Sequence, residues 1–206
     1  MFVQIKLFLY KIGQIVYTIC MAKVLLCSAS PRRRELLKKL IGEFSVTKSD
    51  AEERSRYLRP HLRVMDLAKQ KNAVIREKNV VVISSDTLVY RNGKYYGKPR
   101  DKEDAYRMLR ELSGVKHWVY TGVCLRVGDK VECFYDKASV RFRSLSEQEI
   151  RDYVQEYSPL DKAGAYGIQD DVVVKSYSGS FDTIMGLPTE KLGQKLEKMG
   201  VRDVYK

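Results

Sequence analysis

The chain has 206 residues, of which 44% are hydrophobic and 31% charged, and this composition is typical of a folded globular protein rather than a disordered one. Its formal net charge is +12, so we expect either an anionic ligand or a solvated basic surface. Four cysteines without a C-x-x-C pair and only two histidines argue against a zinc cage and a disulfide framework.

The basic excess lies entirely in the first half of the chain. Residues 1–110 carry 24 Lys and Arg against 11 Asp and Glu, whereas residues 111–206 carry 14 against 15. Residues 1–20 are apolar, but Lys6, Lys11 and Gln14 interrupt the run and no cleavage pattern follows. We therefore expect neither a secretory leader nor a membrane anchor. We interpret residues 1–20 as an extension and residues 21–206 as one domain in the cytoplasm.

The first predicted elements are a strand, a tight loop and a helix. Residues 22–27 form a short apolar run that is typical of a buried strand. Ser30 is a candidate N-cap with Pro31 at the first helical position, followed by leucines at helical spacing. The free backbone N–H groups of this helix would point back toward the loop.

A second helix is predicted over residues 62–76, and the β-branched run 80–84 reads as a central strand. That strand is expected to end at residues 85–87, which would place Asp86 at its carboxyl end. Asn92-Gly93 is a strong signal for a tight turn.

The rest of the chain predicts two helices, a long hairpin and a short strand. An amphipathic helix over 101–113 ends at Gly114, and a hairpin joins 117–127 to 131–143. Ser146 and Glu149 form a capping box for the next helix, a strand follows at 172–174, and a final helix opens near Pro188. Helices and strands alternate early and a hairpin comes later, so the expected class is α/β with a mixed central sheet.

Two features could carry phosphate chemistry. Residues 28–34 read Ser-Ala-Ser-Pro-Arg-Arg-Arg at a strand-to-helix junction, where backbone donors and guanidinium groups could hold an anion. An exposed basic helix start is an equally good interpretation. Asp86 would lie at the same sheet edge and could hold Mg²⁺ or Mn²⁺, with Glu53 as a further oxygen ligand. Two further candidates are Lys98, which lies between a glycine and a proline, and loop 161–169, which contains two glycines.

Taken together, these segments resemble the Maf family of nucleotide pyrophosphatases, in order, from about residue 21 to near the C-terminus. The matching motifs are residues 28–33 (S-x-S-P-R-R), 85–89 (S/A-D-T-x-V), 97–99 (G-K-P), 112–114, 121–123, 159–169 and 186–188. The resemblance implies a two-lobed single domain with a cleft, related to the inosine-triphosphate pyrophosphatase fold and often forming a homodimer.

The resemblance also implies roles for particular residues. Asp86 is expected to be the catalytic acidic residue, as a metal ligand or as a base toward water. The expected substrate-binding residues are Ser28, Arg32, Arg33, Thr87, Lys98 and Gln169. The expected metal ligands are Glu53, Asp86 and Gln169, with Arg32, Thr87 and Gln169 also selecting the substrate.

The implied activity is metal-dependent hydrolysis of nucleoside triphosphates to a monophosphate and pyrophosphate. Loop 162–169 is similar to the branch acting on dTTP, UTP and modified pyrimidine nucleotides, rather than on 7-methyl-GTP. Residues 54–63 are unusually Arg-rich and residues 179–183 lack the family's usual Tyr and Asn, which leaves base selectivity open.

Two other functions remain as alternatives. A non-enzymatic basic protein that binds partners or nucleic acid and affects septum formation would fit the charge, but the Arg-rich helix start lacks interleaved aromatic residues. We therefore expect no stable nucleic-acid partner and no membrane partner. Phosphatase or kinase chemistry would need a G-x-x-x-x-G-K-[ST] loop or a covalent nucleophile motif, and the sequence has neither.

Overall fold

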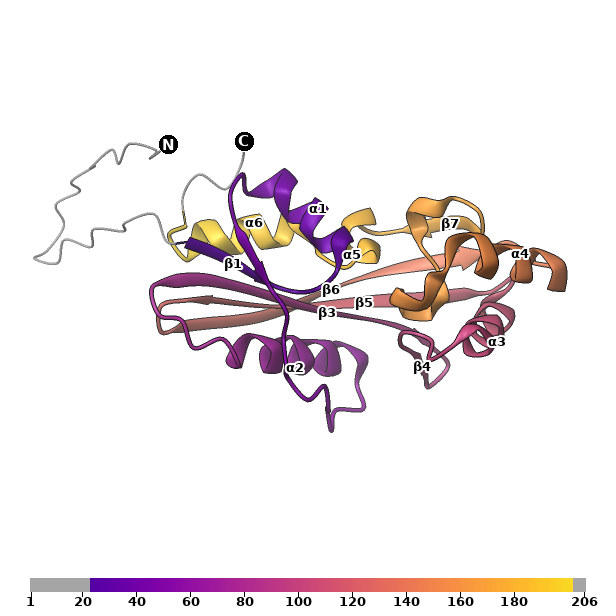
Figure 1. The fold of residues 1–206 in the computed structure, drawn as a ribbon, viewed down its shortest axis with the longest axis horizontal. Helices are drawn as coiled ribbons and strands as arrows, with labels where there is room; N and C mark the ends of the chain where they lie inside the picture. Colours follow the sequence, from indigo (N-terminus) through magenta and orange to yellow (C-terminus); the bar gives the residue numbers. More distant parts are fainter. Residues whose placement is uncertain (1–22, 202–206) are drawn as a thin grey trace, which may run out of the picture.

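The computed structural model describes residues 23–201, which form an α/β structure around one mixed sheet (Figure 1). The sheet has seven strands in the order β2-β1-β3-β5-β6-β7, and β4 pairs with β3. The strands are β1 (Lys23–Cys27), β2 (Ser45–Thr47), β3 (Val80–Arg91), β4 (Lys94–Tyr96), β5 (Lys116–Val127), β6 (Lys130–Phe142) and β7 (Val174–Ser178). The first three in spatial order are parallel and the rest antiparallel, so the predicted mixed sheet is confirmed.

Four of the six described α-helices, α1, α3, α4 and α5, begin at a side-chain cap. The side chain of Ser30 accepts a hydrogen bond from the backbone N–H of Arg33, and Pro31 opens the helix. Ser146 and Glu149 form the predicted capping box. The helices are α1 (Pro31–Leu40), α2 (Pro60–Ala73), α3 (Lys102–Leu112), α4 (Glu147–Tyr157), α5 (Phe181–Met185) and α6 (Thr189–Lys198), with 3₁₀ turns η1 (Pro159–Asp161), η2 (Ala163–Ala165) and η3 (Ile168–Asp170).

Helices cover the sheet from both sides (Figure 1). Helices α1 and α6 pack on one face through a cluster that includes Leu36, Leu37, Leu192 and Leu196, while α2 lies on the opposite face. A second cluster joins α3, α4 and the 3₁₀ turn η2 at the other end of the sheet. The molecule thus has two lobes that share the long strands β3, β5 and β6.

The outer edge of β3 has no neighbouring strand between the end of β1 and the start of the pairing with β4. We call this gap the notch, and a ligand could enter there. Strand β1 ends at Cys27, opposite Ser84 of β3, and β4 pairs with β3 only from Val89 onward. The outer edge of β3 is therefore open at residues 85–88. The prediction that Asp86 ends its strand is wrong, because β3 continues to Arg91 and pairs with β5 on its other edge. Asp86 lies in mid-strand, just beyond the end of β1.

Other boundaries also differ from the prediction. Helix α2 begins at Pro60 and ends at Ala73, and β7 starts at Val174, where the predicted strand ends. Strands β2 and β4, helix α5 and the 3₁₀ turns were not predicted. The proposed extension, residues 1–20, lies outside the described residues.

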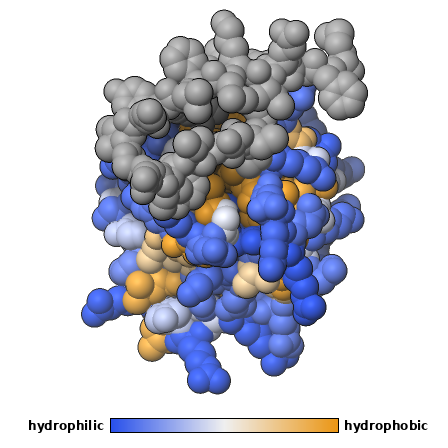
Figure 2. Space-filling view, turned by 90° about the vertical axis from the view of Figure 1, so that its left-hand side faces the viewer, coloured by the Kyte–Doolittle hydropathy of each residue, from blue (hydrophilic) through white to orange (hydrophobic). Residues whose placement is uncertain are grey.

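The end of the molecule near the start of β1 is seen in Figure 2, where hydrophilic side chains predominate among smaller hydrophobic areas outside the grey atoms. Within residues 23–201, no helix combines the length and apolar character needed to cross a membrane.

Candidate active site

A cleft of about 490 Å³ lies at the notch of the sheet, with walls from both lobes. Its volume is within the range of small-molecule sites. Its lining includes all eight predicted site residues: Ser28, Arg32, Arg33, Glu53, Asp86, Thr87, Lys98 and Gln169. The basic helix start and Asp86 therefore face the same space.

The cleft is electropositive. Seven cationic side chains line it against three carboxylates, which are Glu53, Asp86 and Asp161. Within residues 23–201, no salt bridge holds Lys98 or Lys48, and both side chains are exposed. Such an excess of positive charge favours a polyanionic ligand.

The loop between β1 and α1 is held by its own polar groups. The backbone N–H of Ser28 donates to the carbonyl of Thr47 in β2 (2.9 Å). The hydroxyl of Ser28 accepts from the N–H of Ser30 (3.2 Å) and from Nη1 of Arg33 (3.4 Å). The loop is thus fixed at the N-terminus of α1, where partial positive charge favours anions.

Arg33 joins three segments that are far apart in sequence. It donates from Nε to the carbonyl of Gly186 (2.9 Å), from Nη1 to the carbonyl of Ser85 (2.8 Å) and from Nη2 to Oγ1 of Thr87 (2.9 Å). Burial lowers the pKa of Arg33, and the charge of Asp86 opposes this shift. With the bond to Ser28, four of its five N–H donors are engaged, so one donor remains for a ligand.

Arg32 links the two lobes across the cleft. Its Nη1 donates to Oδ2 of Asp161 (2.7 Å) and its Nη2 to the carbonyl of the same residue (3.2 Å). Burial would raise the pKa of Asp161, but Arg32 and Lys162 bring it below its usual value. The Arg32 guanidinium is thereby oriented at the cleft wall.

Asp86 is paired with a lysine that sequence reasoning missed. Nζ of Lys71, from α2, donates to Oδ1 of Asp86 (2.6 Å) and lies 3.1 Å from Oε1 of Glu53. Lys71 and Asp86 are buried, at 7% and 9% exposure. The sequence did contain a signal for this pair, because Lys71 falls on the same face of α2 as Val64, Leu67 and Ala68, at the helical spacing i, i+3, i+4, i+7. A lysine on the apolar face of a helix needs a buried partner.

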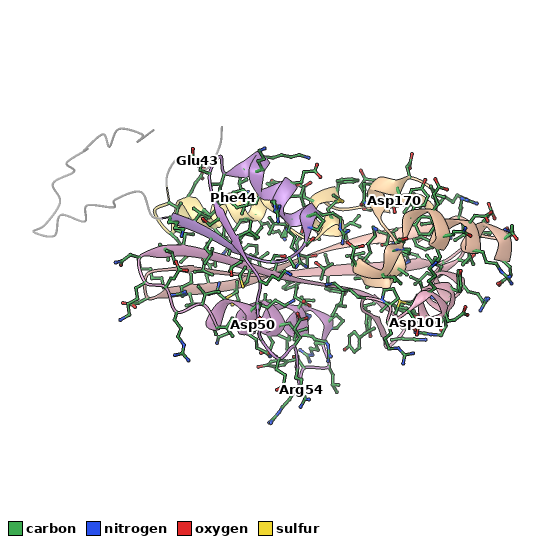
Figure 3. All side chains as sticks on the ribbon, in the orientation of Figure 1. Glu43, Phe44, Asp50, Arg54, Asp101 and Asp170 are labelled. Carbon is green, nitrogen blue, oxygen red and sulfur yellow. The ribbon has the colours of Figure 1, made fainter. Side chains whose placement is uncertain are left out.

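Gln169 is positioned by a short chain of hydrogen bonds on the other side of the cleft. The hydroxyl of Tyr153 donates to Oδ2 of Asp170 and accepts from the N–H of Gly167 (3.0 Å). Oδ1 of Asp170 accepts from the Gln169 amide (2.9 Å). A Cβ on Gly167 would lie 2.3 Å from that amide nitrogen, so a larger residue there would displace the Gln169 side chain. Figure 3 labels Asp170 on one side of the sheet and Asp50, in the segment that leads to Glu53, on the other.

A divalent cation would find carboxylate donors at Asp86 and Glu53. No group of three or more His, Cys, Asp or Glu side chains suited to a metal occurs within residues 23–201. Two carboxylates still fit Mg²⁺ or Mn²⁺, because these ions often bind one or two protein carboxylates together with waters and substrate phosphates.

Several known proteins are similar to this chain over most of its length. A protein from Agathobacter rectalis named dTTP/UTP pyrophosphatase is 38% identical over 203 residues, which are 88% of this chain and 99% of that protein. Proteins of the same name from Bacillus velezensis and Aquifex aeolicus are each 41% identical over 87% of this chain, covering 98% and 96% of their own lengths. Among solved structures, the Ham1 protein of Staphylococcus aureus covers 58% of this chain and 71% of its own, with a TM-score of 0.43 and 13% identity; that likeness is too distant to support an argument. The model of the family described as Maf-like protein matches residues 23–199, and the chain belongs to this family.

Proposed function

We propose that the protein is a nucleoside triphosphate pyrophosphatase that acts on dTTP and UTP, including modified pyrimidine nucleotides, and so removes unwanted nucleotides from the pool. The observation that carries the proposal is the cleft itself, where Asp86, Lys71 and Glu53 face the basic start of α1 and Lys98. The relatives named dTTP/UTP pyrophosphatase, with 38–41% identity over nearly their full lengths, support the substrate class.

In the proposed reaction, a water oxygen bonds to the α-phosphorus while the bond from that phosphorus to the oxygen bridging the β-phosphate breaks. Asp86 accepts a proton from the water, and Lys71 orients its carboxylate by holding Oδ1. Ser28, Arg32, the remaining donor of Arg33 and Lys98 bind the phosphate oxygens. They stabilise the charge on the departing pyrophosphate, so positioning and electrostatics supply most of the rate.

Asp86 and Glu53 would hold a divalent cation, with Gln169 completing the site through its side-chain oxygen or by orienting a water. Such a cation neutralises phosphate charge when bound. Removing divalent cations with a chelator should abolish turnover, and Mg²⁺ or Mn²⁺ should restore it. Full activity in the chelated protein would contradict this part of the proposal.

The substrate choice is assigned to Arg32, Thr87 and Gln169. Thr87 contacts Arg33 and, at 3.0 Å, the hydroxyl of Thr121, so its effect on a ligand would be partly through Arg33. The proposal places the protein in the cytoplasm, where nucleoside triphosphates are made, and includes a homodimer as its assembly.

Product analysis tests the proposal. A panel of dTTP, UTP, CTP, GTP and 7-methyl-GTP is incubated with the protein and Mg²⁺ or Mn²⁺, and the products are separated. We expect monophosphate and pyrophosphate, fastest from dTTP and UTP. Diphosphate and phosphate would instead indicate phosphatase chemistry, and no turnover of any nucleotide would favour the non-enzymatic alternative.

Asp86→Asn is the matched variant for this panel. The amide keeps the size of the side chain but cannot accept the water proton, so turnover should fall by at least about 10² to 10³. Circular dichroism should show an unchanged fold. Near-normal turnover would remove Asp86 from the mechanism, and Glu190→Gln, an exposed carboxylate outside the cleft lining, serves as the control.

A further inference from the structure

The sheet carries a row of aromatic residues that the proposed reaction does not use. Side chains alternate along a strand, and the face that meets α2 at Gly122 continues beyond it with Tyr120 and Trp118 on β5. Tyr90 on β3 is paired with Trp118, and Tyr135 on β6 with Gly122. We call Tyr90, Trp118, Tyr120 and Tyr135 the aromatic face.

The rings of the aromatic face are accessible, and those of Tyr90 and Tyr120 are in edge contact. Trp118 and Tyr135 are each 37% exposed, and Tyr90 and Tyr120 are half-buried. The ring centroids of Tyr90 and Tyr120 lie 6.3 Å apart, and His61 lies 5.0 Å from Tyr135. Contiguous exposed apolar patches, unlike single exposed rings, often mark interaction sites.

Lysines flank the central ring. Nζ of Lys116 lies 5.2 Å and Nζ of Lys137 5.1 Å from the centroid of Trp118. Arg141 is paired with Lys116 across the strands and is exposed. The strand positions of this face beyond Gly122 carry no Asp or Glu: they are residues 88 and 90 of β3, 116, 118 and 120 of β5, and 135, 137, 139 and 141 of β6.

None of the four residues of the aromatic face lines the cleft. Val119 lines the cleft, whereas its neighbours Trp118 and Tyr120 point to the other side of β5 and are not part of the cleft lining. Neither Lys116 nor Lys137 lines the cleft. Leu88 of the same face and Tyr95, whose ring centroid lies 5.4 Å from that of Tyr90, do line the cleft. The face therefore adjoins the cleft, but a ligand held by Trp118, Lys116 and Lys137 would contact no residue of the cleft lining.

We propose that the aromatic face binds single-stranded nucleic acid weakly, with bases stacked on Trp118 and the tyrosines and phosphates held by Lys116 and Lys137. This differs from the expectation from the sequence, which considered only the Arg-rich start of α1 and led us to expect no stable nucleic-acid partner. Stacking rings interleaved with cations are the features that bind single strands without sequence preference. A second copy of the chain fits less well, because a two-fold contact would bring the three cations of each copy together without an opposing carboxylate.

Trp118 is the only tryptophan in the chain, so its fluorescence reports directly on this face. The full chain is titrated with a 12-nucleotide oligothymidine that carries no terminal phosphate. We expect saturable quenching with a Kd on the order of 10⁻⁵ M at low salt. The same quenching should persist when the cleft is saturated with a non-hydrolysable dTTP analogue.

A pair of variants tests the lysines while the reporter stays in place. Lys116→Gln with Lys137→Gln should weaken binding at least about tenfold and lower the slope of log affinity against log salt by about 1.4, at about 0.7 per lost phosphate contact. Lys130→Gln with Lys175→Gln, two exposed lysines elsewhere, should leave both quantities unchanged. Nucleotide turnover should be unaffected in both pairs.

Three results would overturn the proposal. The first is no quenching by the oligonucleotide at low salt. The second is equal quenching by inorganic polyphosphate, which has charge but no bases to stack. The third is sedimentation of the wild type as a dimer that Trp118→Ala converts to a folded monomer, since a second copy would then cover the aromatic face.

Discussion

Lys71 is a single side chain on which the geometry of the site depends, because it holds two carboxylates from different segments. Its Nζ reaches Asp86 at 2.6 Å and Glu53 at 3.1 Å, from a position that is 7% exposed. Removing one partner of a buried ion pair leaves the other charge uncompensated, and this costs more than the pair itself contributes.

Lys71→Met should therefore lower both activity and stability. We expect turnover to fall on the order of 10²-fold or more, because Asp86 loses the group that orients it, and the free energy of unfolding to fall by about 3 kcal/mol. Steady-state kinetics and urea unfolding measure the two effects. Lys71→Arg keeps the charge and should recover most of the stability; unchanged kinetics in Lys71→Met would show that the pair is not part of the mechanism.

His117 is a buried neutral group that makes stability depend on pH. Burial lowers its pKa from 6.5 to about 4, and its Nε2 lies 3.0 Å from the hydroxyl of Tyr166. The unfolded chain therefore binds a proton at a pH where the folded chain does not. The neutral form stabilises the fold fully above pH 6.5, and this stability is lost as the pH falls from 6.5 toward 4.

The expected contribution of His117 at neutral pH is about 3 kcal/mol. Urea unfolding at pH 7 and pH 4.5 should show a smaller pH dependence in His117→Gln than in the wild type. His61 is present in both proteins, so its effect cancels. An identical pH dependence in the two proteins would contradict the burial of a neutral His117.

At the level of elements, the position of α2 on the sheet determines whether Lys71 reaches Asp86. Gly122 is paired with Asp86 across β5 and β3. A Cβ on Gly122 would lie 2.4 Å from the carbonyl carbon and oxygen of Val64 in α2. Backbone atoms cannot move aside as the end of a flexible side chain can, so α2 would have to shift as a unit.

Gly122→Ala should destabilise the protein by about 1–3 kcal/mol through overpacking and lower turnover by displacing Lys71. Urea unfolding and kinetics measure the two effects. Gly97→Ala is the stability control, since no atom lies within 4 Å of a Cβ there and its φ is not in the left-handed region. Equal stabilities for the two alanine variants would show that α2 does not depend on the glycine.

The strand elements also show where sequence patterns stop being informative. The apolar run predicted β3 only over 80–84, but the strand continues to Arg91 because β5 pairs with it as far as Tyr90. Ser85 and Asp86 are polar yet buried, since β5 and α2 cover them. No local pattern marks them as strand residues, because their pairing partners on β5 lie more than 30 residues away.

At the scale of the whole molecule, charge guides the ligand. The chain has a net charge of +12, and seven cations against three carboxylates line the cleft. A field of this sign attracts a triphosphate and is screened by salt.

Raising the ionic strength at constant free metal should therefore lower kcat/KM for dTTP severalfold, while kcat changes little. Initial rates between 50 and 400 mM salt measure this dependence, and a neutral osmolyte at matched osmolality controls for bulk effects. A flat kcat/KM over that range would show that binding does not depend on the net field.

The sequence by itself determined the local features: the Ser30 cap with Pro31, the Ser146 capping box, the mixed α/β class and the motifs whose side chains meet in one cleft. These features depend on neighbours within a few residues or on motifs read in order. Only the tertiary structure decided that Asp86 lies in mid-strand beside the end of β1, that Lys71 is its partner, and that Arg33 bonds to Ser85 and Gly186, 52 and 153 residues away. Such contacts depend on how the helices pack on the sheet. Packing between segments that are distant in sequence leaves no periodic pattern in the chain, so the sequence alone cannot predict it.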